Sequence, residues 1–343
     1  MKTNRGIRLF GLCCTVLLAA CLILSGCGGE STSTNGGETE GTITLSLGHV
    51  SAPDLPYDIA SKGFAQEVEQ ATNGKIKIEV FGSGQLGGDR DMIEQVQLGT
   101  LDFYAGSTAS LTNFVPELEV MDLPFLFKNY EHVYAALDGE VGELLTKKIE
   151  TNGFKNLGFW EQGFKNISNN ERAVRSAEDM EGIKMRIQES PLLSETYRAL
   201  GADPTPIPFP EVYTSIQQGV ADGYEGSFVP FCDVKLYEVQ DYLSEVQISF
   251  GSAILLMNKD RFDSLDPEIQ KTIVELGEKY AKEERRVNRE ILDNLRKTAI
   301  SEDVEVISYD EIDIQSFSEA VKPVYEKYSQ FDELVSTIRA LEK

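Results

Sequence analysis

The chain has 343 residues, with 56 Asp and Glu against 32 Lys and Arg, so its formal net charge at pH 7 is −24. This acidity excludes nucleic acid as an expected partner, because no basic patch is available to neutralise phosphates. The same acidity repels anions at long range, so an anionic ligand would need locally focused positive charge. The length is sufficient for two domains with separate cores.

The N-terminus has the pattern of an export signal. A basic stretch over residues 2–8 precedes an apolar run over 9–24 and the tetrapeptide LSGC, which ends at Cys27. This order is typical of a secretory signal, and the apolar run is short for a membrane-spanning helix. The LSGC ending resembles a lipobox, in which Cys27 is lipidated; the alternatives are a plain signal peptide and an uncleaved anchor. We expect residues 1–26 to be removed and acyl chains on Cys27 to hold the protein at the membrane.

Residues 27–42 are rich in Gly, Ser, Thr and Glu. Such a composition cannot bury a core, so it predicts a disordered tether between the lipid and the folded part. After Cys27 the chain has one further cysteine, Cys232, so no disulfide framework is expected, although the compartment would permit one.

The first half of the folded part alternates strands and helices. Apolar alternation predicts strands over 43–47 and 76–80, and helical spacing predicts a helix between them. After a glycine-rich turn, a second helix begins near Asp89, where an acid suits the helix dipole. A strand over 101–105 then ends beside Ser107. Strands separated by helices favour a mostly parallel sheet.

The next segments carry fewer signals. Residues 114–126 are apolar and contain two prolines, which indicates a packed loop without chemistry. Residues 158–169 follow another expected strand, and they contain Lys165. Asp266-Pro267 is a good helix start, and helical spacing continues to about residue 299, which corresponds to roughly 50 Å. A last strand near 304–307 and a terminal helix over 314–341 follow.

Residues 182–226 contain the strongest candidate for a ligand site. Alternating apolar residues predict a strand over 183–187 that places Arg186 on its opposite face, near the carboxyl end. Open α/β sheets bind ligands at that end, and arginine grips a carboxylate through two parallel charge-assisted bonds. On spacing alone, a surface ion pair with a protein carboxylate is the more common role of such an arginine.

Several of these segments resemble the DctP family, the extracytoplasmic solute-binding proteins of TRAP transporters. The matching stretches are GKIKIEVFGSGQLGGDRDMIEQVQLGTLDF, FVPELEVMDLPFLFKNYEH, IKMRIQESP, LGADPTPIPFPEVYTSIQQGVADGYE and KLYEVQDYL. The resemblance implies an α/β, two-domain periplasmic-binding-protein-like fold, with a cleft between the domains and a long helix spanning both. We assign 43–163 with 252–290 to the first domain and 164–251 with 291–343 to the second.

The resemblance also implies which residues contact the ligand. Arg186 matches the strand arginine that binds the substrate carboxylate. Lys165 stands where the family usually has a second arginine, so the charge remains but the bidentate geometry is lost. Asp89 either contacts a substrate hydroxyl or amine or only caps its helix. Phe209 either packs against the ligand or belongs to the core, and Ser107 is a weaker candidate at the end of its strand.

The family motif Asp-Gly-Gln-Glu-Asn-Pro is changed in this chain to the sequence DGYEGS over residues 222–227. The asparagine amide that helps to hold the carboxylate is therefore missing at Gly226. Tyr224 adds an aromatic ring that can stack on a ligand or bond to it, and Glu225 is retained. We expect a pocket that has space at Gly226 and is reshaped for a different or bulkier acid.

These observations predict a membrane-tethered receptor that captures a small organic acid outside the cytoplasm and delivers it to TRAP permease subunits, with no cofactor and no metal. An extracytoplasmic hydrolase or lyase is the alternative from another class. It is disfavoured because the chain has two histidines, His49 and His132, and neither a Gly-x-Ser-x-Gly nor an HExxH motif. A sensory lipoprotein that presents its ligand to a receptor would use the same pocket, and the sequence does not separate it from a transport protein.

Overall fold

The computed structural model describes residues 41–342. The expected signal, the lipidation site at Cys27 and most of the tether lie outside the described residues. Within those residues, no helix is both long enough and apolar enough to span a bilayer.

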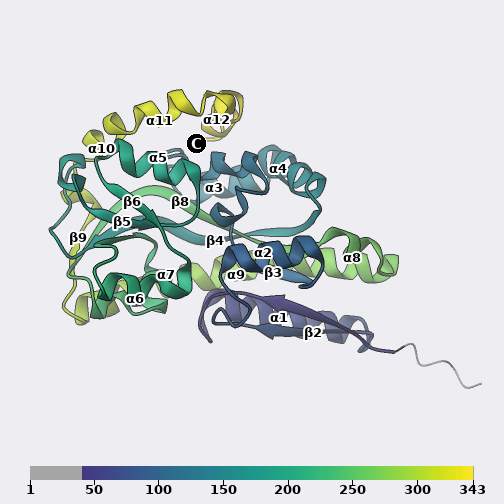
Figure 1. Cartoon of the computed structure of the whole chain (residues 1–343). Helices are drawn as coiled ribbons and strands as arrows, with labels where there is room; N and C mark the ends of the chain where they lie inside the picture. The colour runs from purple at the N-terminus through teal and green to yellow at the C-terminus, as the bar shows by residue number, and fades with distance from the viewer. Residues whose placement is uncertain (1–40, 343) are drawn as a thin grey trace, which may run out of the picture. The chain divides into compact units, whose positions relative to one another are not determined.

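A mixed nine-stranded sheet forms the centre of the described chain (Figure 1). Eight strands follow the order β2-β1-β3-β8-β4-β7-β5-β6, and β9 pairs with β8. The strands are β1 (Ile43–Gly48), β2 (Ile76–Phe81), β3 (Phe103–Ser107), β4 (Phe154–Asn169), β5 (Lys184–Ile187), β6 (Asp203–Pro206), β7 (Gly223–Gly226), β8 (Tyr242–Asn258) and β9 (Glu305–Ile307).

The two long strands β4 and β8 join the two ends of this sheet. They pair antiparallel from Phe154 opposite Asn258 to Asn169 opposite Tyr242. β3 pairs with one end of β8 and β7 with the opposite end of β4, both antiparallel. The flanking pairs β1–β2, β1–β3, β5–β6, β5–β7 and β8–β9 are parallel. The sheet is therefore mixed, and the expectation of a mostly parallel sheet holds only on either side of the central pair.

The division into two domains stays a prediction, but its boundaries lie where the pairing of β4 with β8 is irregular. Gly163 on β4 pairs with Gly251 on β8, directly after an irregularity in the ladder. Gly163 has a φ of +98°, a conformation that favours glycine. The boundaries assigned at 163/164 and 251/252 therefore lie beside an irregularity of β4 at its pairing with β8.

Twelve α-helices surround the sheet in the described residues. They are α1 (Pro56–Ala71), α2 (Asp89–Leu98), α3 (Tyr130–Leu137), α4 (Glu140–Thr151), α5 (Pro191–Ala199), α6 (Val212–Gln217), α7 (Phe228–Asp233), α8 (Lys259–Asp263), α9 (Pro267–Ser301), α10 (Ile314–Ala320), α11 (Lys322–Lys327) and α12 (Asp332–Ala340). The C-terminal helices α10, α11 and α12, yellow in Figure 1, lie along α5 and α4.

The long helix α9 agrees with the sequence-based prediction in both its start and its length. It has 35 residues, or about 52 Å. The Asp266 side chain accepts a hydrogen bond from the Glu268 N–H and Pro267 is the first helical residue, which is a favourable N-terminus. α9 packs against α1 and β4, and its Arg285 Nε donates to the Phe159 carbonyl at 3.0 Å.

Two sequence-based expectations about the remaining segments need correction. The single terminal helix over 314–341 is instead broken into α10, α11 and α12, because Pro323 has no N–H and cannot continue the helix from α10. The packed loop over 114–126 contains a 3₁₀ helix, η2 (Pro116–Asp122), and most of its residues are buried.

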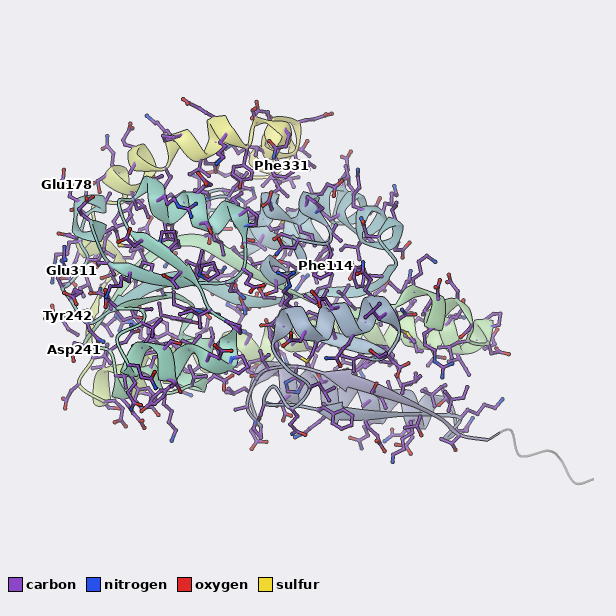
Figure 2. The ribbon with its side chains drawn as sticks, viewed as in Figure 1. Phe114, Glu178, Asp241, Tyr242, Glu311 and Phe331 are labelled. Atoms are coloured by element: carbon purple, nitrogen blue, oxygen red, sulfur yellow. The ribbon has the colours of Figure 1, made fainter. Side chains whose placement is uncertain are left out.

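Three apolar clusters form the core of the described residues. The largest lies among β4, β8, α2 to α5 and the C-terminal helices, and it includes Phe331, which Figure 2 labels. The second packs α1 and α9 against the sheet around β1 and β2, and the third surrounds α6, α7 and β7. The segments that meet at the site described below are therefore each anchored by their own apolar packing.

Candidate ligand-binding site

A cavity lies among α1, α2, β4, β5, β7, α7 and α9. Six of the seven residues predicted to bind a ligand line it, namely Arg186, Lys165, Asp89, Phe209, Tyr224 and Glu225. Gly226 also lines it. Residues that are more than a hundred positions apart in the sequence therefore meet at one cavity.

Arg186 is buried at the cavity wall and is not part of a surface ion pair. Met185 and Ile187, its neighbours on β5, are fully buried in the core. The Arg186 Nε donates to the Ile207 carbonyl at 2.9 Å, and its guanidinium carbon lies 5.3 Å from the centre of the Tyr224 ring. Within residues 41–342, no carboxylate lies within ion-pair distance of Arg186, and no hydrogen bond engages its terminal nitrogens. The terminal nitrogens of this guanidinium therefore lack a protein partner among the described residues.

Lys165 is also buried, but its charge is already compensated by the protein. Its Nζ lies 3.3 Å from a Glu225 oxygen and 3.5 Å from an Asp122 oxygen, and it donates to the Gln188 side-chain oxygen at 3.2 Å. Burial lowers the pKa of Lys165, and Glu225 and Asp122 more than reverse this, so its pKa lies above the usual value. Burial raises the pKa of Asp122 to about 6, although Lys165 opposes the shift. This ammonium therefore organises two protein carboxylates beside the cavity.

Asp122 is a site residue that sequence reasoning missed. It ends η2, in the segment to which we assigned no chemistry. It lies in the stretch FVPELEVMDLPFLFKNYEH, which resembles the family, but nothing in that stretch marks its role, because the role comes from the contact with Lys165 more than forty residues further along the chain. A buried lysine requires a partner, so the family stretch together with that requirement was the available signal.

Asp89 occupies the first position of α2, where Gly88 rather than Asp89 is the N-cap. Its Oδ1 accepts a hydrogen bond from the Tyr104 hydroxyl at 2.8 Å. Burial raises the pKa of Asp89, while Tyr104 and Arg186 lower it. The simple capping role is therefore wrong, and the carboxyl group faces the cavity as an acceptor.

Ser107 does not line the cavity. Its hydroxyl donates to the Gln188 side-chain oxygen at 3.3 Å, the same oxygen that Lys165 contacts. Gln188 does line the cavity. Ser107 thus reaches the site only through Gln188.

Tyr224 and Gly226 form a coupled pair. They lie two residues apart on β7, so they face the same side of the sheet. A Cβ atom at Gly226 would lie 2.5 Å from a ring carbon and 2.5 Å from the hydroxyl oxygen of Tyr224. The ring therefore fills the space that we expected Gly226 to leave open. Phe209 has both expected roles, because it lines the cavity and belongs to the third apolar cluster.

Other polar residues on the cavity wall were not predicted. They include Glu161 and Asn288, which are fully buried, Tyr57, which is buried, and Asp233, which is half-buried. Asp233 accepts hydrogen bonds from the Ser51 hydroxyl and the Ala52 N–H. Neither His49 nor His132 lines the cavity.

The chain is similar to characterised solute-binding proteins along most of its length. Residues 47–331 match the family model for bacterial extracellular solute-binding protein, family 7, known as DctP. The 2,3-diketo-L-gulonate-binding periplasmic protein YiaO of Escherichia coli K12 is 30% identical over 282 residues, which are 81% of this chain and 84% of the relative. The C4-dicarboxylate-binding periplasmic protein DctP of Rhodobacter capsulatus is 35% identical over 229 residues, 66% of this chain and 68% of the relative.

Solved structures agree with these matches. A TRAP periplasmic solute-binding protein from Polaromonas sp. JS666, bound to D-erythronate, superposes with a TM-score of 0.85 and is 33% identical. The match covers 88% of this chain and 99% of that one. The mixed α/β architecture predicted from the sequence is thus confirmed, and the family consists of binding proteins for transport rather than enzymes. This chain belongs to the DctP family of extracytoplasmic solute-binding proteins of TRAP transporters.

Proposed function

We propose that this protein captures a small organic acid by pairing the ligand carboxylate with Arg186, and delivers the acid to TRAP membrane subunits. The observation that carries the proposal is the buried guanidinium at the cavity wall, which has no carboxylate partner among residues 41–342. A buried arginine without a counter-ion is costly, so the site favours an anion from outside. The ligands named for the similar proteins above are all acids.

Closure of two domains around the ligand is part of this proposal. Asp89 belongs to the first predicted domain and Arg186 to the second, and both line the cavity. A ligand that touches both sides binds the closed state more tightly than the open state, which is the condition for ligand-driven closure. Solution X-ray scattering measures this directly, because the radius of gyration should decrease on ligand saturation. An unchanged radius would contradict closure.

The test of the function has two stages. A thermal-shift screen of organic acids, keto acids and sugar acids identifies ligands, because a bound ligand raises the melting temperature by mass action. Calorimetry then compares the wild type with Arg186→Lys, which keeps the charge but loses the planar fork. We expect affinity to fall by about 2 kcal/mol, or roughly thirtyfold. Arg198→Lys, at an exposed arginine outside the cavity, is the control. Unchanged affinity in Arg186→Lys would remove this residue from the carboxylate role.

We further propose that lipid on Cys27 tethers the protein to the outer face of the cell membrane. The support is the LSGC sequence and the polar stretch that follows it. Cys27→Ser should release the protein from membranes in cell fractionation while ligand affinity is unchanged. A variant that is processed and still sediments with membranes would contradict acylation at this residue.

A further inference from the structure

Part of the cavity wall carries buried polar atoms without protein partners. Glu161 Oε1, Asn288 Oδ1 and the Tyr57 hydroxyl have no partner of good hydrogen-bond geometry among the described residues, although the Tyr57 hydroxyl interacts with the Gln162 side chain, and all three residues line the cavity. Glu161 and Asn288 have no exposed surface, and Tyr57 is 7% exposed. A buried polar atom without a partner costs about 1–3 kcal/mol. Three of them at one cavity indicate a place for polar groups of a ligand.

The other polar atoms of Glu161 and Asn288 form hydrogen bonds with the protein. These bonds determine whether each unpartnered atom can donate or accept a hydrogen bond. The other carboxylate oxygen of Glu161 accepts a hydrogen bond from the Tyr134 hydroxyl at 2.6 Å. The Asn288 Nδ2 donates to the Glu161 carbonyl at 3.1 Å, so the amide oxygen is the end that lacks a partner. An amide oxygen can only accept a hydrogen bond, and a carboxylate oxygen does the same when ionised. The Glu161 and Asn288 oxygens therefore require a donor, whereas the Tyr57 hydroxyl can donate or accept.

The charges around the cavity allow one ligand carboxylate rather than two. Two cationic side chains line it, Arg186 and Lys165, against four carboxyl groups, those of Asp89, Glu161, Glu225 and Asp233. Lys165 already lies within ion-pair distance of two carboxylates, one of which is Glu225. Arg186 alone remains for an incoming anion. A second ligand carboxylate would face acceptors and like charge, which is unfavourable in a buried site.

We infer that the ligand is a hydroxylated monocarboxylic acid, whose carboxylate binds Arg186 and whose hydroxyl groups bind Glu161, Asn288 and Tyr57. This inference rests on the proposed function and narrows its ligand class by excluding unsubstituted dicarboxylates. A hydroxyl group suits the site because it both donates and accepts. It can donate to the Asn288 oxygen and to an ionised Glu161, and it can accept from Glu161 when that group is protonated. Burial raises the pKa of Glu161 to about 7, so both forms are populated near neutral pH.

The test compares acids of the same carbon number that differ in their number of carboxylates and in whether they carry hydroxyl groups. Calorimetry on the wild-type protein uses four acids of four carbons: erythronate, tartrate, butyrate and succinate. A second set has six carbons: gluconate, glucarate, hexanoate and adipate. In each set one acid is a hydroxylated monoacid, one a hydroxylated diacid, and two are the corresponding acids without hydroxyls. In at least one set we expect the hydroxylated monoacid to bind ten times more tightly than each of the other three.

The three possible failures are distinguishable. If succinate, adipate or another diacid binds as tightly as the hydroxylated monoacid of the same length, the inference is wrong and the proposed function stands. If butyrate or hexanoate binds as tightly as the hydroxylated monoacid of the same length, the inference is also wrong and the proposed function stands. If none of the eight acids binds, both the inference and the proposed function are contradicted.

Variants test whether Glu161 and Tyr57 cause the preference for a hydroxylated monoacid. Glu161→Gln removes the charge and places an amide there, so the ratio of monoacid to diacid affinity should fall at least fivefold. Glu119→Gln makes the same change at a buried carboxyl group outside the cavity and should leave the ratio unchanged. Tyr57→Phe removes a single oxygen that has no hydrogen bond of good geometry in the described chain and interacts only with the Gln162 side chain. This variant replaces Glu161→Gln in the test if Glu161→Gln fails to fold. It should weaken binding of the hydroxylated monoacid while leaving the unsubstituted monoacid unaffected. An unchanged affinity ratio in both cavity variants would overturn the assignment to these residues.

Discussion

At the scale of single residues, Lys165 is the clearest case of a side chain that holds the site together. Its ammonium lies between Asp122 and Glu225, which come from segments a hundred residues apart. Lys165→Met fills a similar volume but leaves two carboxyl groups facing each other without a cation. We expect the free energy of unfolding to fall by about 3–5 kcal/mol, the usual cost of removing one partner from a buried pair, measured by denaturant titration of the ligand-free protein.

The control for this prediction is Lys184→Met. Lys184 pairs with Asp222 at 3.4 Å, but about half of its side chain is exposed. Exposed pairs contribute about 0–1 kcal/mol, so stability should change little. Equal effects of the two substitutions would show that the buried cluster does not depend on its cation.

Gly226 provides a second prediction at this scale. Because a Cβ atom there would meet the Tyr224 ring at 2.5 Å, Gly226→Asn should destabilise the protein by about 1–3 kcal/mol through overcrowding. In a Tyr224→Gln background the ring is absent, and the same substitution should cost less than half as much. A double-mutant cycle of unfolding free energies measures this coupling. Additive effects would mean that the ring moves aside freely.

The same contact bears on ligand binding. Lys165→Arg combined with Gly226→Asn would recreate the residue types that the family usually has at these positions. We expect this double variant to bind the ligand of the native protein less tightly, because the displaced Tyr224 ring also packs under Arg186. Tighter binding in calorimetry would contradict a pocket shaped by Tyr224.

At the scale of elements, α9 depends on one close approach to β4. A Cβ atom at Gly277 would lie 2.5 Å from the Leu157 carbonyl oxygen, which is backbone and cannot rotate away. Alanine normally stabilises a helix by about 1 kcal/mol relative to glycine. Here we expect the reverse, a loss of about 1–3 kcal/mol in unfolding free energy for Gly277→Ala. Glu278→Ala, at the exposed neighbouring position, controls for helix propensity, and a stabilising Gly277→Ala would refute the close contact.

The elements that could be predicted are those with a local signal. α9 was predicted because Asp266-Pro267 marks its start and its apolar residues recur at helical spacing. β8 was not, because nearly all of its residues are buried. A strand buried on both faces shows no alternation and reads as a plain apolar run. The crossing pair β4–β8, which connects the two ends of the sheet, therefore appears only in three dimensions.

The residues of the candidate site also divide into those with a local sequence signal and those without one. Arg186, Tyr224 and Glu225 lie within motifs that the sequence displays, and the structure places them on one cavity. Tyr57 and Asn288 carry no local pattern, and the family-like stretch that contains Asp122 does not mark its role. Their relevance comes from contacts across long sequence separations, such as the bond from Asn288 to the Glu161 carbonyl. Sequence patterns identified the proposed anion-binding end of the cavity and could not identify the polar groups around it.

At the scale of the whole molecule, excess acidity extends into the interior. Burial raises the pKa of Glu119 and Glu161 to about 7, and those of Asp122 and Asp233 to about 6. Each of these groups keeps its proton in the folded state at pH values where the unfolded chain has lost it. Their contribution to stability is complete below about pH 4 and is lost as the pH rises through 6 to 7.

We therefore expect the ligand-free protein to become more stable as the pH falls from 8 to 6. Burial lowers the pKa of His49 to about 4, which opposes the trend, but only below about pH 6.5 and for one group against four. If the four acids together contribute about 2 kcal/mol, the melting temperature should rise by roughly 5 °C.

Thermal unfolding in 0.5 M salt should retain most of this rise, because salt screens surface repulsion far more than it affects buried groups. The combined variant Glu119→Gln with Asp233→Asn should show a smaller rise, since two of the four titrating groups are gone. A melting temperature that is constant or falls between pH 8 and 6 would show that these carboxyl groups are ionised in the folded protein.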